Sequence, residues 1–110
     1  MANLKDARAK VTHITLSDGV KRELKYTLNA LAEMEDKYGS VDEAFKILEA
    51  GSIKAVRFFL WAGLLHTEEN LTEMQIGSMI DVTALEEIMA TVGDALSNDM
   101  PVPGEQLPNA

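Results

Sequence analysis

The segment from Lys54 to His66, KAVRFFLWAGLLH, constrains the fold of this chain more than any other feature. It is long enough for a helix and is apolar on almost every side, with only Lys54 and Arg57 charged near its start. A helix of this kind lies either at the centre of a core or against a partner. Because a chain of 110 residues has little mass with which to cover it, the segment favours a small helical domain that works by binding.

Composition excludes several classes of function. A net charge of −8 opposes nucleic-acid binding, which needs clustered Lys and Arg. The absence of cysteine excludes disulfides, thiol nucleophiles and cysteine-based zinc sites. The apolar run from Ile53 to Leu65 is too short to span a bilayer, and the first ten residues lack the apolar region of a signal peptide. We therefore expect a cytoplasmic protein that binds neither nucleic acid nor membrane.

The beginning of the chain predicts a β-hairpin in residues 11–26. Val11 to Leu16 is rich in β-branched residues, and Asp18-Gly19 is a strong tight-turn signal. The segment that follows alternates with period two, and one of its faces carries Val20, Arg22, Leu24 and Tyr26. A lone hairpin is marginal in water, so we expect Val20, Leu24 and Tyr26 to pack on the helices that follow.

About five helices are predicted within residues 27–97, from apolar residues that recur at helical spacing. The N-caps that we expect are Thr27, Ser40, Ser52, Thr72 and Thr83. Three of these N-caps form predicted capping boxes, with Glu43, Gln75 and Glu86 respectively. Gly63 lies inside the apolar helix, where it costs about 1 kcal/mol relative to Ala and predicts the close approach of another helix.

The expected fold class is α+β and mainly α: an N-terminal antiparallel β-hairpin packed on a bundle of short helices. We expect one globular domain over residues 11–97, preceded by a flexible N-terminus of residues 1–10. Residues 98–110 contain all three prolines and show no periodicity, which predicts a disordered tail.

No pattern in the chain predicts catalysis, a metal site or a cofactor. His13 and His66 are the only imidazoles, and neither has a neighbour at ligand spacing. His66 is better explained by favourable placement at a helix C-terminus. The paired carboxylates lie on predicted polar faces or in loops, where nothing shifts a pKa towards neutrality. We therefore expect a protein that is not an enzyme, with no catalytic residue, no metal ligand and no cofactor.

The apolar helix leaves two alternatives open. In the first, all of its large side chains belong to the core, which is the usual role of such stripes. In the second, one face stays open for a partner. The six methionines of the chain add modest weight to the open face, because flexible thioethers adapt to varied partners. The residues that we predict to bind a partner form two stripes, one in each of the two longest apolar patterns: Phe58, Trp61 and Leu65, then Leu85, Ile88, Met89 and Val92.

Several short motifs occur in a characteristic order between about Val11 and Leu96. The first is Asn29-Ala30-Leu31 with Glu33, Glu35 and Gly39, and the second is Leu60-Trp61-Ala62-Gly63-Leu64 followed by Leu71-Thr72. The third runs from Ile80-Asp81 to Leu85-Glu86-Glu87-Ile88. In this order and spacing the chain resembles the tail assembly chaperones of long-tailed bacteriophages and related gene transfer agents.

The resemblance implies a non-enzymatic assembly factor in the cytoplasm of a bacterial host. Such a protein binds the tape measure protein while the tail tube polymerises, and it is absent from the mature virion. Further implied partners are the tail tube protein and a longer, frameshifted form of the chain itself. An exposed apolar helix also favours a homo-oligomer when the client is absent. The alternative is a small acidic protein-binding adaptor or inhibitor of another system.

Overall fold

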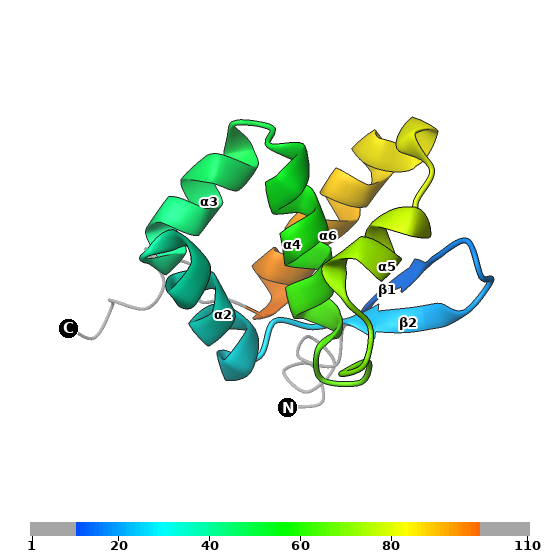
Figure 1. Ribbon diagram of the computed structural model, residues 1–110, viewed down its shortest axis with the longest axis horizontal. Helices are drawn as coiled ribbons and strands as arrows, with labels where there is room; N and C mark the ends of the chain where they lie inside the picture. Colours follow the sequence, from blue (N-terminus) through cyan, green and yellow to red (C-terminus); the bar gives the residue numbers. More distant parts are fainter. Residues whose placement is uncertain (1–10, 100–110) are drawn as a thin grey trace, which may run out of the picture.

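The computed structural model describes residues 11–99, which form a two-stranded antiparallel hairpin followed by helices (Figure 1). The predicted flexible N-terminus and residues 100–110 of the predicted tail lie outside the described residues. The elements are, in order, β1 Thr12–Thr15, β2 Lys21–Leu24, α2 Leu28–Tyr38, α3 Val41–Glu49, α4 Ile53–Leu64, α5 Glu73–Ser78, the 3₁₀ helix η1 Val82–Ala84 and α6 Leu85–Asp99. The expected fold class, α+β and mainly α, is confirmed.

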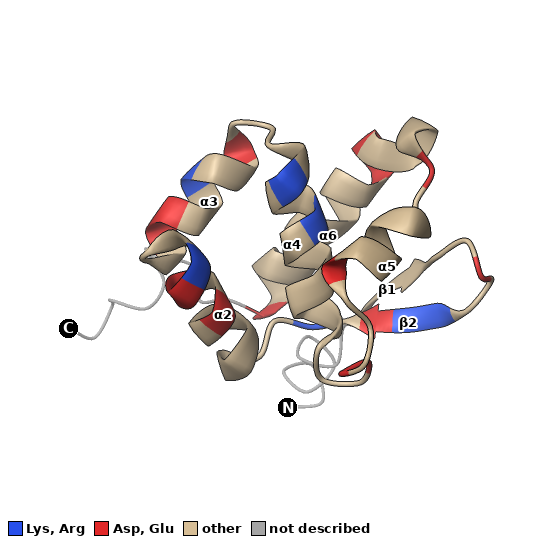
Figure 2. Cartoon of the chain, viewed as in Figure 1, with Lys and Arg blue, Asp and Glu red and all other residues tan. Residues whose placement is uncertain are grey.

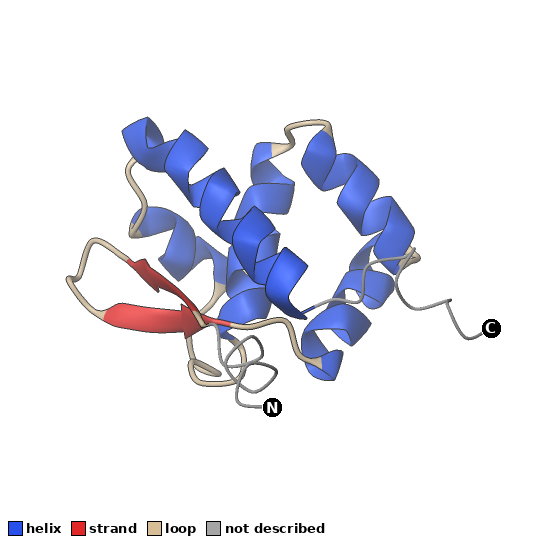
Figure 3. Ribbon diagram, turned by 180° about the vertical axis from the view of Figure 1, so that it is seen from behind, coloured by secondary structure: helices blue, strands red, loops and turns tan. Residues whose placement is uncertain are grey.

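Helix α4, the apolar helix, stands at the centre of the fold. It packs against β2, α2, α3, α5 and α6, and in Figure 3, which shows the molecule from behind, α6 crosses in front of it beside the hairpin. Eight of its twelve residues are buried, including Phe59 and Leu60, which are wholly inaccessible. Most faces of this helix are therefore core, as the first of the two alternatives requires.

The hairpin forms at the predicted place, but its inward face differs from the prediction at one position. Thr12 pairs with Leu24 and Thr15 with Lys21, about a turn in which Gly19 has a φ of 81°. Leu24 and Tyr26 are buried, as expected, whereas Val20 is 47% exposed.

The prediction for Val20 is wrong because β2 begins one residue later, which leaves Val20 outside the strand, and the first inward position of β2 is that of Arg22. The Arg22 guanidinium is neutralised by two carboxylates, with Nη2 2.8 Å from Asp18 Oδ2 and Nε 3.1 Å from Glu68 Oε2. A charge that is paired and hydrogen-bonded in this way can be buried at tolerable cost.

Four of the five predicted N-caps are confirmed: Thr27, Ser40, Ser52 and Thr72 each accept a hydrogen bond from a backbone N–H of the first turn. The prediction for Thr83, with its capping box to Glu86, is wrong. Asp81 is the cap instead, because its side chain accepts from the Thr83 N–H and starts η1, which runs directly into α6.

Two further predictions need correction. The close neighbour of Gly63 is strand β2, not another helix: a Cβ on Gly63 would lie 2.6 Å from Leu24 Cδ1, and the N–H of Lys25, just past the strand, donates to the Gly63 carbonyl over 2.9 Å. Helix α6 also continues through Asp99, two residues past the predicted end of the domain. The reason is that Asn98 Nδ2 donates to Thr12 Oγ1 and Asp99 Oδ2 accepts from the Tyr26 N–H, each over 3.0 Å, which ties the last turn to the hairpin.

Candidate partner-binding groove

An apolar groove of about 330 Å³ opens between α4, α5 and the η1–α6 segment. This volume is at the small end of the range of protein ligand pockets. The groove is lined by Ile53, Val56, Arg57, Leu60, Met74, Gly77, Ser78, Ile80, Val82, Leu85 and Ile88. Arg57 is the one charged residue among these lining residues.

Exposed apolar side chains stand around this groove. Ile53 is 61% exposed, Met74 72% and Val82 80%, and each comes from a different wall. They are three of the six large apolar residues that are exposed within residues 11–99, and the other three are Val11, Val20 and Leu28. An exposed apolar patch continuous with a hollow is a typical mark of a binding surface.

The local sequence explains why the hollow stays open. Helix α4 presents Ile53, Val56, Arg57 and Leu60 at positions i, i+3, i+4 and i+7, the spacing of one continuous helical face. The neighbouring helix α5 has only six residues, and its lining positions include Gly77 and Ser78. A short helix with small side chains cannot fill the space beside a full helical face.

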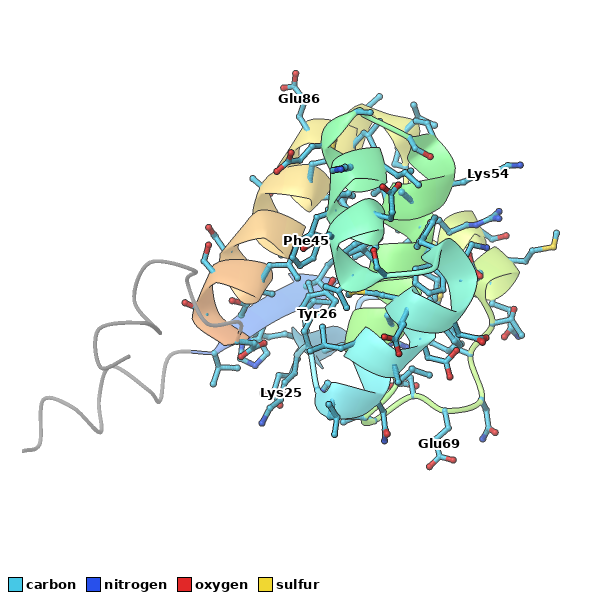
Figure 4. All side chains as sticks on the ribbon, turned by 90° about the vertical axis from the view of Figure 1, so that its left-hand side faces the viewer. Lys25, Tyr26, Phe45, Lys54, Glu69 and Glu86 are labelled. Atoms are coloured by element: carbon cyan, nitrogen blue, oxygen red, sulfur yellow. The ribbon has the colours of Figure 1, made fainter. Side chains whose placement is uncertain are left out.

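The charge beside the groove lies on α4. Lys54 and Arg57 are the two basic residues of this helix and are its two blue segments in Figure 2. Arg57 is 39% exposed and its Nε lies 3.5 Å from Glu73 Oε1, at ion-pair distance. The Arg57 Nε is buried and makes no hydrogen bond within the described residues. Lys54 is exposed, and Figure 4 shows its side chain pointing away from the domain.

A second, shallower hollow lies beside the groove and shares Arg57 and Met74 with it. Trp61 lines this hollow, and its Nε1–H donates to the Leu71 carbonyl over 3.1 Å. The only tryptophan of the chain is therefore close enough to report on events at the groove.

The first predicted partner-binding stripe is not an open surface. Phe58 is only 3% exposed and packs against Tyr38 and Trp61, with ring centroids 5.5 and 5.4 Å away. Trp61 and Leu65 are half-buried. The prediction that Phe58 faces outward is wrong, because α2 covers this face of α4 through Tyr38.

The second predicted stripe divides between core and groove. Val92 is 1% exposed and belongs to the core, and Met89 is half-buried against it. Leu85 and Ile88 line the groove, so they are the predicted residues that the structure brings to this site. Three further groove residues, Ile53, Met74 and Val82, were not predicted from the sequence. The N-caps at Ser52 and Thr72 were a usable signal for two of them, because they place Ile53 and Met74 in the first turns of α4 and α5, where neighbouring helices cover little.

No group of three His, Asp or Glu side chains within residues 11–99 could hold a metal ion. His66 lies just past α4 with its Nε2 3.6 Å from Glu23 Oε1, and His13 is exposed on β1. No described helix combines the length and the apolar character needed to cross a membrane.

Comparison of the chain with protein-family models, with curated proteins and with solved structures finds no match. The resemblance to tail assembly chaperones therefore stays a prediction from the sequence motifs.

Proposed function

We propose that this protein is a phage tail assembly chaperone that binds the tape measure protein and assists assembly of the tail tube. The observation that supports this most is the apolar groove with Ile53, Met74 and Val82 exposed around it. A chaperone for an amphipathic helical client needs an exposed apolar surface on a domain whose net charge keeps it dispersed. A net charge of −8 meets the second need.

In this proposal the groove covers one short apolar stretch of the client at a time. A small interface is typical of transient complexes, and a chaperone that is absent from the mature virion must release its client. Many copies bound along one long tape measure helix then keep its apolar stripe from aggregating until tube subunits replace them. The tail tube protein and a longer form of the chain are further partners in this proposal.

The test is co-expression of the chain with a candidate tape measure protein, a long helical protein from the same genome, followed by affinity purification. Val82→Asp places a charge in the groove, and Leu28→Asp is its matched control, since both side chains are 80% exposed and only Val82 lines the groove. We expect the unchanged chain and Leu28→Asp to retain the client and Val82→Asp to lose it. Retention by Val82→Asp and Met74→Asp alike would contradict the assignment of the groove, and no retention by the unchanged chain would contradict the function.

The second candidate is a small acidic adaptor or inhibitor that masks a basic target, and the net charge of −8 favours it. Salt separates the two candidates. Contacts between exposed charges weaken strongly as ionic strength rises, whereas apolar contacts do not. A partner that is released by about 0.5 M salt and is unaffected by Val82→Asp would identify the adaptor.

A further inference from the structure

The charge next to the groove differs from that of the chain as a whole. Asp and Glu outnumber Lys and Arg by eighteen to ten, yet the two charged residues of α4, Lys54 and Arg57, are both basic. Arg57 lines the groove and Lys54 follows the lining residue Ile53. Figure 2 shows these two segments on α4, while the loop before α6 and the first turn of α6 are red. The α4 wall is therefore basic on an acidic protein.

The guanidinium of Arg57 has hydrogen-bond donors that its contact to Glu73 does not use. It carries five N–H donors, and its contact to Glu73 is 3.5 Å long and leaves the buried Nε without a hydrogen bond within the described residues. The stem of Arg57 lies over α5, with its Cδ 3.0 Å from the point where a Cβ on Gly77 would be. This packing holds the guanidinium beside the groove, where a carboxylate from a partner can pair with it.

The walls of the groove select a helix over an extended segment. An extended segment binds by pairing its backbone with unpaired backbone groups, but these walls are mainly helical and their interior backbone groups are paired within the helices. A helix needs only a complementary apolar face. The face of α4 from Ile53 to Leu60 spans about 10 Å, which matches about two turns of an incoming helix.

We propose that the groove binds an amphipathic helix of another protein whose apolar stripe is flanked, on the side facing α4, by carboxylates that pair with Arg57 and Lys54. This inference rests on the proposed function, because it specifies the chemistry of the client at the same site. The apolar contact supplies the attraction, and the two ion pairs set the orientation and the choice of helix.

The experiment uses two synthetic helical peptides as probes. Both carry the same leucine stripe, and the positions that flank it on one side are Glu in the first peptide and Lys in the second. Binding to the full chain is measured by peptide fluorescence anisotropy and by the emission of Trp61, at about 0.15 M salt, where the Debye length of about 8 Å limits the influence of distant charges.

We expect the Glu peptide to bind about tenfold more tightly than the Lys peptide, although the net charge of the protein favours the Lys peptide. In the double variant Lys54→Glu, Arg57→Glu the preference should reverse. Lys54→Glu alone should reduce it by a few fold; because Lys54 is exposed, this variant remains informative if the change at Arg57 unfolds the domain. Thermal melts of each variant check the fold.

Three results would overturn the inference. The first is tighter binding of the Lys peptide than of the Glu peptide to the unchanged chain. The second is that the two peptides bind with equal affinity both to the unchanged chain and to the double variant, and the third is that neither peptide binds. If Val82→Asp converts a dimer into a monomer in sedimentation and neither peptide binds, the groove belongs to a second copy instead. A tape measure fragment that binds without regard to Lys54 and Arg57 would leave the proposed function standing and remove this inference. If the chain prefers the Glu peptide but does not bind the tape measure protein, the inference about the groove stands and the proposed function is removed.

Discussion

Replacement of Gly63 by alanine should destabilise the fold, whereas the same replacement at Gly93 should stabilise it. Both glycines lie inside helices, Gly63 in α4 and Gly93 in α6. A Cβ added to Gly63 would lie 2.6 Å from Leu24 Cδ1, a distance at which something must shift, and 3.0 Å from Tyr26 Cζ, which is a tight contact. A Cβ added to Gly93 meets nothing within 4 Å.

The magnitudes follow from two opposing terms. Alanine is favoured over glycine in a helix interior by about 1 kcal/mol, and at Gly93 this gain acts alone. At Gly63 the extra methyl overpacks the core, which costs about 1–3 kcal/mol in general. The upper part of that range applies, because Leu24 is 1% exposed and Tyr26 is held by its hydroxyl, which donates to the Phe59 carbonyl over 2.7 Å. The net loss at Gly63 is therefore about 1–2 kcal/mol.

Thermal melts should show the melting temperature of Gly93→Ala rising by about 4–8 °C and that of Gly63→Ala falling by at least as much. A double-mutant cycle with Leu24→Ala identifies the cause, since removal of the Leu24 side chain removes the clash. The pair should be more stable than the sum of the single changes by at least about 1 kcal/mol. Additivity within about 0.5 kcal/mol, or a stabilising Gly63→Ala, would refute the close approach of β2 to α4 as the reason for this glycine.

Three further predictions concern other parts of the fold. Phe58→Ala should lower the free energy of unfolding by about 3–5 kcal/mol and Trp61→Ala by less, as measured by urea denaturation, because only Phe58 is fully enclosed. Hydrogen bonds from Arg22 lower the pKa of Asp18 to about 2, so this carboxylate contributes stability above its unfolded value near 3.8 that is lost as the pH falls towards 2. Acid melts of Asp18→Asn should lack this part of the loss, and an unchanged acid profile would contradict it. Thr72→Ala should cost about 1 kcal/mol in the same urea assay, because its hydroxyl caps α5.

The sequence by itself determined the local structure of this protein. The Asp18-Gly19 turn and the N-caps at Thr27, Ser40, Ser52 and Thr72 all appear where they were predicted. Each of these features depends on residues within four positions of one another, so its physical cause is contained in a short stretch of chain. The fold class followed from the same local signals.

The tertiary structure decided which faces are covered. Arg22 is buried on the inward side because Glu68, 46 residues away, supplies the second carboxylate, whereas Val20 lies outside β2 and is exposed. Phe58 is core because Tyr38 of α2 packs on it, whereas the groove along the same helix stays open because α5 is short. Periodicity identifies an apolar face, but it cannot tell which distant segment lies on that face or how much of it that segment fills. Burial depends on contacts between residues far apart in the chain, and these are set only when the elements pack together.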